Sequence, residues 1–457
     1  MGSNPSIPKG TRDFGPVEMT RRNYIFDTVR KVFRLYGYLP LETPAMENLT
    51  TLLGKYGEEG DKLLFRVLNS GDFLSSVSQP DLLVADYQRI AGIIAEKGLK
   101  YDLTVPFARY VVQNRNEITF PFKRFQIQPV WRADKPQKGR YREFYQCDVD
   151  VIGSDSLYNE YELVQIINEV FSRLNITNSI RINNRKILVG IAEIINEGDR
   201  ITDVTIAIDK LEKVGIEKVN EELSSRGVSA EAIMKLQPIL FIRGDTLDKL
   251  DQLGAILAGS ETGLKGISEM RTLFTYLKND KFGSDIQLDL TLARGLEYYT
   301  GAIIEVNSLD YEIGSICGGG RYDDLTGVFG LPGVSGVGVS FGADRIYDVL
   351  KQLDLFPERI DSDVLVMFAN FGEVEVRLAE SILKQLRKAG FSSELYPDKV
   401  KMKRQLSYAN SRNIPYVVLL GEEEMLKGII TLKDMKSGEQ MQIKAEELID
   451  FLNSRPD

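Results

Sequence analysis

The chain has 457 residues, of which 43% are hydrophobic and 27% charged, and its net charge is −9. This composition is typical of a folded globular protein of about three domains, and it excludes a disordered chain or a fibre. The chain contains no histidine and only two cysteines, Cys147 and Cys317. These counts exclude a nucleophile activated by histidine, a metal bound by histidine, a zinc site made of cysteines alone and a disulfide framework. No apolar run reaches about 18–20 residues and no signal peptide is present, so we expect no membrane span.

The first part of the chain predicts a helix, an edge strand and a hairpin. Apolar residues recur at three- and four-residue steps over residues 16–36, which is typical of an amphipathic helix. Residues 38–44 contain two prolines and are expected to form an edge strand. Residues 124–132 and 142–151 alternate as strands do, and a polar loop joins them. A helix over 158–174 and a strand over 179–183 follow.

The remainder of the chain predicts a helical segment and a separate α/β unit. Residues 184–279 are rich in Lys, Glu, Leu and Ile at helical spacing and are expected to form a mainly helical insertion. Strands are expected at 286–292 and 302–307, followed by glycine-rich turns at 314–320 and 330–342. After a linker at 355–362, strands at 363–368, 392–395, 416–420, 428–434 and 440–444 accompany helices at 373–389, 401–411 and the C-terminus. This pattern predicts a small sheet buried on both faces.

Three segments contain groups that suit phosphate chemistry. The loop from Arg132 to Arg142 carries five basic residues against one aspartate, a net charge of +4. Arginines there could clamp a phosphate with two hydrogen bonds, although a solvated loop tip is an equally good explanation. Residues 294–301 place an arginine and paired tyrosines at one turn, which suits a polar pocket or a core edge. Glycines at 318–320 and 333–342 precede Arg345 and would let a ligand lie close to the backbone.

Together these segments resemble the histidyl-tRNA synthetases, a family of class II aminoacyl-tRNA synthetases. The loop and the glycine-rich segment look like motifs 2 and 3, and residues 294–301 look like the histidine-specific signature. The resemblance extends from residues 9–13 through 101–110 to the C-terminal unit. It implies an α+β fold, with a catalytic domain over 1–355 built on an antiparallel sheet with flanking helices. It also implies an insertion over 184–279 and an α/β anticodon-binding domain over 362–457.

The resemblance also implies an activity and the partners of the chain. The expected reaction condenses L-histidine with ATP to histidyl-adenylate and transfers histidine to the 3′ end of tRNA(His). The substrate carboxylate is already an anion, so arginine and Mg²⁺ bound with ATP can supply the electrostatic stabilisation without a protein base. No metal is expected on His or Cys side chains. A cytoplasmic homodimer is expected, with the 16–36 helix and the strand near Pro44 at its interface.

By motif matching, each candidate residue receives a role. Arg132 and Arg294 are expected to be catalytic, on opposite sides of the α-phosphate and next to the histidine. The ATP site would also use Phe144 under the adenine and Arg140 and Arg345 at the outer phosphates. The remaining expected histidine contacts are Asp102, Thr104 and Gln146 at the ammonium group and Asp150, Tyr298 and Tyr299 at the imidazole. Gln137 and Lys138 are candidates for contacts with the tRNA acceptor stem.

The sequence departs from the family at three places. Residues 73–98 are longer than the usual connection, Asp344 stands where many relatives have Glu, and Asp150 is shorter than the Glu of many bacterial members. Two alternatives from another functional class stay open. The chain could be a catalytically silent paralogue, similar to the regulatory subunit of ATP phosphoribosyltransferase, or an RNA-binding pseudo-synthetase. The presence of Arg132, Arg294 and Arg345, the insertion and the C-terminal unit favours the enzyme.

Overall fold

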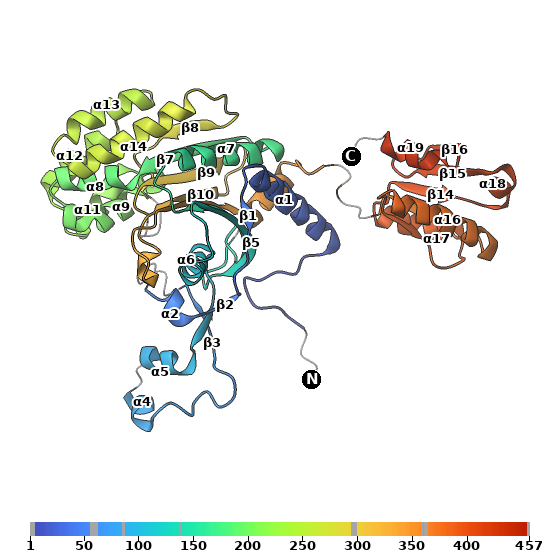
Figure 1. The fold of residues 1–457 in the computed structure, drawn as a ribbon, viewed down its shortest axis with the longest axis horizontal. Helices are drawn as coiled ribbons and strands as arrows, with labels where there is room; N and C mark the ends of the chain where they lie inside the picture. Colours follow the sequence, from blue (N-terminus) through green and yellow to red (C-terminus); the bar gives the residue numbers. More distant parts are fainter. Residues whose placement is uncertain are drawn as a thin grey trace. The chain divides into compact units, whose positions relative to one another are not determined.

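The computed structural model of the protein describes residues 5–54, 63–84, 87–137, 139–293, 299–357, 360 and 364–454. The chain divides into two compact units (Figure 1). The larger unit comprises Met1–Asp13 and Ile25–Leu355, and the C-terminal unit comprises Phe14–Tyr24 and Phe356–Asp457. Among the described residues, no helix is long and apolar enough to cross a membrane.

An eight-stranded sheet forms the centre of the larger unit, in the order β1-β5-β6-β11-β10-β9-β7-β8. Neighbouring strands are antiparallel from β5 to β7, whereas the edge strands β1 and β8 pair in parallel. This confirms the antiparallel sheet and the edge strand before Pro44. The strands are β1 (Leu39–Pro40), β5 (Phe122–Trp131), β6 (Glu143–Ile152), β7 (Asn178–Asn184), β8 (Asp285–Leu288), β9 (Ala302–Ser308), β10 (Ser315–Tyr322) and β11 (Gly336–Gly342).

Two segments expected to be glycine-rich turns are strands, which corrects the sequence-based expectation. Residues 315–322 form β10 and residues 336–342 form β11, at the middle of the sheet. Glycine is needed there because the strands and their neighbours approach too closely for a side chain. A Cβ on Gly319 would lie 2.1 Å from the carbonyl oxygen of Gly338. The expected strand over 286–292 is also shorter, because Asp289 accepts a hydrogen bond from the backbone of Thr291 (2.8 Å) and turns the chain after Leu288.

One face of the eight-stranded sheet is apolar and is covered by α1 (Pro16–Leu35) and α7 (Tyr158–Arg173). The ring of Phe33 on α1 lies 5.6 Å from that of Phe125 and 5.7 Å from that of Phe341. Phe171 on α7 lies 5.6 Å from the same Phe341 ring. Both helices have the apolar spacing that the sequence predicted, and burial of their apolar stripes fixes them on this face.

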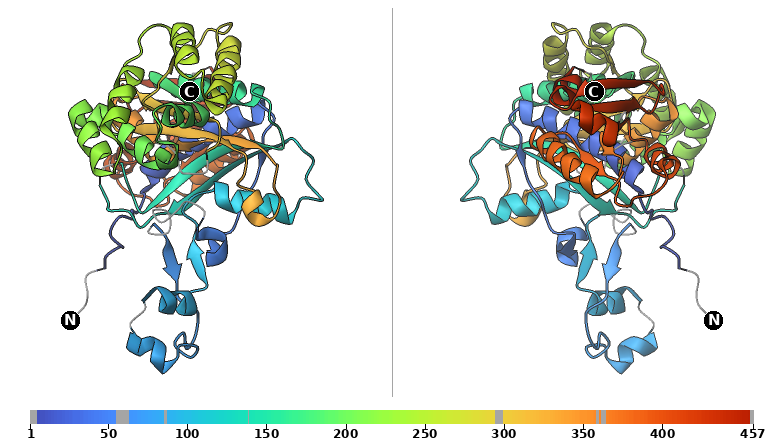
Figure 2. Two further views of the ribbon diagram at one scale, coloured as in Figure 1. Left: turned by 90° about the vertical axis from the view of Figure 1, so that its left-hand side faces the viewer. Right: turned by 90° about the vertical axis from the view of Figure 1, so that its right-hand side faces the viewer.

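The segment that is longer than usual, residues 73–98, carries two helices and the start of β4, the middle strand of a small second sheet with the order β2-β4-β3. In Figures 1 and 2 this sheet and the helices that follow β3 project from the rest of the larger unit. A short 3-10 helix, η2 (Gly327–Phe329), and α6 lie closer to the main sheet. The elements are β2 (Met46–Asn48), α2 (Leu49–Leu52), β3 (Phe65–Val67), α4 (Gln79–Val84), α5 (Tyr87–Ile94), β4 (Lys97–Leu99) and α6 (Thr104–Gln113).

The segment between β7 and β8 is helical, as its composition indicated. Its first helix packs on its last one so closely that a Cβ on Gly190 would lie 2.5 Å from the Cα of Gly263. The helices are α8 (Arg185–Ile194), η1 (Gly198–Arg200), α9 (Ile201–Ile208), α10 (Leu211–Val214), α11 (Ile216–Ser225), α12 (Ala230–Leu240), α13 (Thr246–Ile256) and α14 (Glu261–Leu277); α15 (Ala343–Gln352) follows β11.

The C-terminal unit contains a five-stranded sheet with the order β13-β12-β14-β15-β16. Val366, Phe368 and Val418 are buried with α16 and α19 on one face, whereas Met367 and Val417 are buried with α17 on the other. This confirms an α/β unit with both faces of its inner strands covered. A helix that the sequence did not predict, α18, is short and acidic and lacks an apolar stripe. The elements are β12 (Val366–Phe368), α16 (Glu373–Lys388), β13 (Ser393–Leu395), α17 (Met402–Ser411), β14 (Tyr416–Leu419), α18 (Glu422–Lys427), β15 (Ile429–Asp434), β16 (Gln440–Lys444) and α19 (Glu447–Asn453).

Candidate active site

The face of the eight-stranded sheet opposite α1 and α7 carries a row of polar side chains. Residues at alternate positions of a strand share one face, and directly opposite residues of antiparallel strands share that face too. The register therefore places side chains of β5, β6 and β11 together on what we call the polar floor. Its cross-strand rows are Arg124–Asp150–Gly338, Gln126–Asp148–Ser340 and Gln128–Gln146–Gly342, with Phe144 next along β6.

The centre of the polar floor has no room for side chains on Gly338 and Gly320. A Cβ on Gly338 would lie 2.0 Å from Oδ1 of Asp150, and one on Gly320 would lie 2.4 Å from the carbonyl oxygen of Ala302. The same Cβ on Gly320 would lie 3.1 Å from the ring of Tyr299, one of the paired tyrosines of the sequence motif. The glycine-rich segment thus brings side chains from β6 and from the residue pair before β9 over the middle of the sheet.

Asp150, expected at the imidazole, lies at the closed end of the polar floor. Its Oδ1 accepts a hydrogen bond from the hydroxyl of Tyr322 (2.6 Å), and its Oδ2 lies 2.9 Å from a terminal nitrogen of Arg124. Arg124 is fully buried, and its guanidinium lies 4.1 Å from the centre of the Phe107 ring on α6. The ion pair has the distance but not the angles of a hydrogen bond, since neither atom has a hydrogen-bond partner among the described residues.

Asp148, two residues earlier on the same face, was missed by the sequence analysis. It is buried, and its Oδ1 has no hydrogen-bond partner among the described residues. Burial raises the pKa of this carboxyl, while Arg124, the Ser340 hydroxyl and Arg132 favour its charged form. The alternation 144, 146, 148, 150 on β6 could have revealed Asp148, because three of these four positions were already candidates.

Gln146 and Asp102 have similar surroundings. Nε2 of Gln146 donates to Oγ of Ser340 (2.9 Å), which leaves the buried Oε1 without a partner among the described residues. Oδ1 of Asp102 accepts from the backbone nitrogen of Val105 in the first turn of α6 (3.3 Å), and its Oδ2 has no partner there either. Burial raises the pKa of Asp102 to about 7 against the attraction of Arg132, and Asp148 raises it further. Thr104 is partly exposed at the start of α6.

The two motif residues assigned to the nucleotide lie together at the other end of the polar floor. The guanidinium carbon of Arg132 lies 5.2 Å from the centre of the Phe144 ring. Nε of Arg132 donates to the carbonyl oxygen of Tyr101 (2.9 Å), one residue before Asp102. This hydrogen bond fixes the arginine without using its terminal nitrogens, which are the groups that bind a phosphate bidentately.

Arg345 and Arg140 meet at the hairpin loop between β5 and β6. Arg345 donates to the carbonyl oxygens of Gly139 (3.0 Å) and Ser315 (2.6 Å). Arg140 is half exposed and forms an ion pair with Asp134 (3.2 Å), and its backbone pairs with that of Gln137 across the loop tip. The loop brings both predicted phosphate ligands to one end of the site, and Lys138, the other acceptor-stem candidate, lies outside the described residues.

Asp344, which replaces the usual Glu of the family, connects three parts of this end of the site. It forms an ion pair with Arg12 and accepts a hydrogen bond from the backbone nitrogen of Tyr145 (2.9 Å). Arg12 in turn stacks on Tyr141, 3.4 Å from the ring centre. The N-terminal segment is therefore anchored beside the motif 2 loop by a buried carboxylate, and the shorter side chain still reaches its partners.

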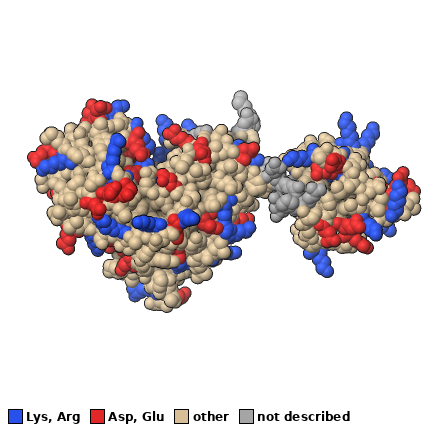
Figure 3. All heavy atoms as spheres, turned by 90° about the horizontal axis from the view of Figure 1, so that it is seen from above, with Lys and Arg blue, Asp and Glu red and all other residues tan. Residues whose placement is uncertain are grey.

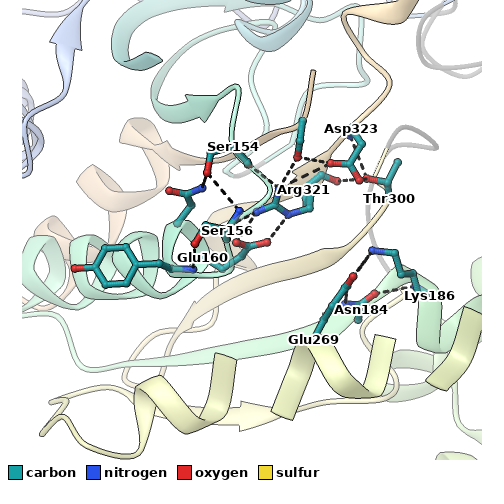
Figure 4. Close-up of polar contacts among 12 residues, drawn as sticks. Ser154, Ser156, Glu160, Asn184, Lys186, Glu269, Thr300, Arg321 and Asp323 are labelled. Carbon is teal, nitrogen blue, oxygen red and sulfur yellow. Dashed lines mark hydrogen bonds and ion pairs between the residues drawn. The ribbon is translucent and has the colours of Figure 1, made fainter. Parts of the chain in front are cut away.

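A buried ion-pair network anchors the residues before β9 (Figure 4). Arg321 pairs with Glu160 on α7 (2.6 Å) and donates to the carbonyl oxygens of Ser154 (3.2 Å) and Ser156 (3.3 Å). On the other side, the backbone nitrogen of Thr300 donates to the carbonyl oxygen of Arg321 (2.8 Å), and its Oγ1 donates to Asp323 (2.6 Å). This holds Tyr299 and Thr300 at the rim of the site. Arg294 and Tyr298 lie outside the described residues.

The charges of the molecule are mixed rather than segregated. On the face seen in Figure 3, basic and acidic side chains are interspersed over both units. Among the described residues, no group of three or more Cys, Asp or Glu side chains has the arrangement of a metal site.

Comparisons with known proteins identify the family of the chain. Residues 95–346 match the model of the family described as "Histidyl-tRNA synthetase", and residues 363–455 match that of the "Anticodon binding domain". The chain is 60% identical over 452 residues to a curated histidine–tRNA ligase of Bacteroides fragilis, covering 99% of this chain and 100% of that one. It is 60% identical over 442 residues to that of Porphyromonas gingivalis, covering 97% of each chain.

The solved structures give the same result. The crystal structure of histidyl-tRNA synthetase from Nostoc sp. PCC 7120 superimposes with a TM-score of 0.86 at 32% identity over the full length of both chains. A Bacillus halodurans structure titled as an ATP phosphoribosyltransferase regulatory subunit/histidyl-tRNA synthetase shares the fold at 21% identity, with a TM-score of 0.71. At that identity it shows the fold alone, whereas the relatives above match across both units. The chain belongs to the histidyl-tRNA synthetase family.

Proposed function

We propose that the polar floor of the larger unit is the site at which this histidine–tRNA ligase condenses histidine with ATP. The observation that carries the proposal is the set of buried acceptor oxygens on Asp102, Gln146 and Asp148 that lack partners among the described residues. Buried acceptors without donors are costly in a protein, so their presence indicates a ligand that brings donors. Arg132 and Phe144 lie next to them, where a phosphate and a planar base can follow the amino acid.

Each residue of the site has a separate role in adenylate formation. The histidine carboxylate attacks the α-phosphorus of ATP and needs no base, because it is ionised at neutral pH. Arg132 holds the α-phosphate and neutralises the charge that develops on it, with Arg294 on the opposite side. Phe144 stacks on the adenine. Arg140 and Arg345 bind the outer phosphates, for which Arg140 must exchange Asp134 for the ligand.

The remaining assigned residues determine which amino acid and which tRNA are used. Asp102, Thr104 and Gln146 bind the substrate ammonium group. Tyr298, Tyr299 and Asp150 with its partner Tyr322 line the imidazole pocket. Gln137 and Lys138 contact the acceptor stem of tRNA(His), and the C-terminal unit binds the anticodon. Mg²⁺ that accompanies ATP would supply positive charge to its phosphates, beside the arginines.

We further propose a homodimer that acts in the cytoplasm. The free edge of β1 and the end of α1 carry exposed apolar side chains, since Leu35 is 67% and Leu39 59% exposed. An exposed strand edge with apolar neighbours is suited to pairing with a second copy. Both cysteines, Cys147 and Cys317, are buried and form no disulfide, which is compatible with a reducing compartment.

Histidine-dependent exchange of pyrophosphate into ATP tests this function directly. We expect the wild-type chain to catalyse the exchange and Arg132→Gln to lower its kcat by about 100- to 1000-fold, because the lost contact acts on the transition state. Lys9→Gln, which removes a charge from an exposed position, is a control for general effects of charge. A wild-type chain that binds tRNA but shows no exchange would refute the proposal in favour of a silent paralogue.

A further inference from the structure

Five side chains on or beside the polar floor have a buried oxygen without a hydrogen-bond partner among the described residues, namely Asp102, Gln126, Gln146, Asp148 and Asp150. That oxygen of Asp150 faces Arg124. Asp102, Gln146 and Asp148 share one structural arrangement. In each side chain one polar group is held by a protein donor or acceptor and the other is left free. Val105 holds Oδ1 of Asp102, and Ser340 accepts from Nε2 of Gln146 while its hydroxyl hydrogen-bonds to the Asp148 carboxylate. The three remaining oxygens, Oδ2 of Asp102, Oε1 of Gln146 and Oδ1 of Asp148, are buried without partners among the described residues. Such an arrangement is preorganised for a ligand with several donors.

Ser340 determines the orientation of two of these side chains at once. Because its oxygen accepts from the Gln146 amide, the hydroxyl hydrogen is available only to another acceptor, which is the Asp148 carboxylate. Gln146 must then present its carbonyl oxygen, not its amide nitrogen, to the site. At this point the polar floor therefore presents only hydrogen-bond acceptors, and it would repel a ligand carboxylate or phosphate.

Buried charges of both signs lie around the free oxygens. The carboxylates are Asp102, Asp148 and Asp150, and the guanidiniums that act on them are Arg124 and Arg132. The buried ammonium group of Lys100 also acts on Asp148. Among the described residues, Arg124 lies within ion-pair distance of Asp150, at 2.9 Å, and the free oxygen of Asp148 stays available to a positively charged donor.

We propose that Asp148 accepts a hydrogen bond from the α-ammonium group of bound histidine, as the third acceptor beside Asp102 and Gln146. This inference rests on the proposed function and adds a specificity-determining residue to it. An ammonium group has three N–H donors and one positive charge, which match three acceptor oxygens, two of them on carboxylates. A neutral imidazole or a ribose hydroxyl offers one donor and no charge. The Asp150 carboxylate is held instead by Tyr322 and Arg124, at the end assigned to the imidazole.

The test removes the charge of Asp148 and the ammonium group separately and together. Binding of histidine and of 3-(imidazol-4-yl)propionate, which lacks the amino group, is measured by calorimetry at about pH 8 with wild type and Asp148→Asn. We expect Asp148→Asn to weaken histidine binding by about 10- to 100-fold, the usual effect of a hydrogen bond to a charged group. Binding of the propionate should change by less than about threefold, since the lost partner is absent.

A second ligand distinguishes the ammonium from the ring. For 1,2,4-triazole-3-alanine, which keeps the amino group, Asp148→Asn should reduce binding by the same factor as for histidine. Asp150→Asn is the matched buried carboxamide variant, and its effect should depend on the ring and not on the amino group. Equal losses with histidine and with the propionate would overturn the assignment of Asp148, as would a loss that depends on the ring.

Folding and the proposed function are checked in the same series. Asp148→Ser gives a smaller side chain with a hydroxyl and should show the same selective loss if Asp148→Asn does not fold. The thermal midpoint of each ligand-free variant reports structural damage independently of binding. If the wild-type chain itself fails to bind histidine, the proposed function is wrong; if it binds histidine and Asp148→Asn binds equally well, only the role of Asp148 is wrong.

Discussion

Buried polar side chains of the two units differ in how completely they are hydrogen-bonded. In the C-terminal unit, Gln405 is fully buried and every polar atom is used. It donates to the carbonyl oxygens of Asn370 (2.9 Å) and Val400 (3.0 Å) and accepts from the backbone nitrogen of Asn370 (2.7 Å). On the polar floor, Gln126 and Gln146 each keep a buried side-chain oxygen without a partner among the described residues.

This difference separates a structural sheet from one that binds small molecules. The inner strands of the C-terminal sheet are apolar on both faces, so their side chains stabilise the fold. The larger sheet uses only one face for its core. Its other face carries charges and unsatisfied acceptors at a cost in stability, which bound substrate offsets.

The largest effect is expected where the polar floor has no room for a side chain. Gly338→Ala would place a methyl group 2.0 Å from Oδ1 and 2.4 Å from Cγ of Asp150. We expect a loss of about 1–3 kcal/mol in unfolding free energy from overpacking, and about 100-fold or more in pyrophosphate exchange from the displaced carboxylate. Gly342→Ala on the same strand is the control, because its methyl group would lie 3.6 Å from the carbonyl oxygen of Ile316, an ordinary contact distance. This variant should unfold like wild type. A Gly338→Ala variant with normal exchange would contradict the packing argument.

A matched pair of glutamine substitutions tests the comparison itself. Gln405→Leu leaves the backbone groups of Asn370 and Val400 without partners and should cost about 1–3 kcal/mol in stability, with pyrophosphate exchange near wild type. Gln146→Leu removes an unsatisfied acceptor, so we expect stability within about 0.5 kcal/mol of wild type and a histidine KM raised by about 10- to 100-fold. Denaturant unfolding and exchange kinetics measure both. Similar stability losses in the two variants would remove the distinction between the sheets.

The smallest effect concerns the pH dependence of stability. Burial raises the pKa of Asp102 to about 7, whereas an unfolded aspartate has a pKa of about 3.9. Between these values the folded protein binds a proton that the unfolded chain does not, so the ligand-free protein loses stability as pH rises from about 4 to about 7. Asp148, whose pKa burial also raises, contributes in the same direction. Asp102→Asn should therefore remove the Asp102 part of this loss and be more stable than wild type by about 1–2 kcal/mol at about pH 8.

Thermal unfolding across this pH range measures the effect. The exposed substitution Glu169→Gln should follow the wild-type curve, since Glu169 contacts only Arg173 on the surface of α7. Histidine should reverse the trend for wild type, because its ammonium group favours the ionised carboxylates. A wild-type curve parallel to that of Asp102→Asn would show that Asp102 titrates normally and would remove the electrostatic argument for its role.

Much of the architecture could be predicted from the sequence because local patterns dominate it. The helix over 16–36, the strands on either side of the basic loop and the helical segment before β8 all follow from apolar spacing, and the structure confirms them. The family could be recognised because its motifs are contiguous in the chain. The glycine-rich strands were mistaken for turns, since glycine is common in turns and the close contacts that require it come from other strands.

The sequence by itself determined most of the helices and strands, which family the chain belongs to and that its chemistry must proceed without histidine. Only the tertiary structure decided which partner each polar group meets. Asp148 and Asp150 are two residues apart on one face of β6, and each keeps one oxygen without a hydrogen-bond partner among the described residues. Tyr322 and Arg124 lie against Asp150, whereas the Ser340 hydroxyl lies against Asp148. That difference depends on the register of β5, β10 and β11 against β6, which brings together residues up to about 200 positions apart, and no local pattern encodes such partners.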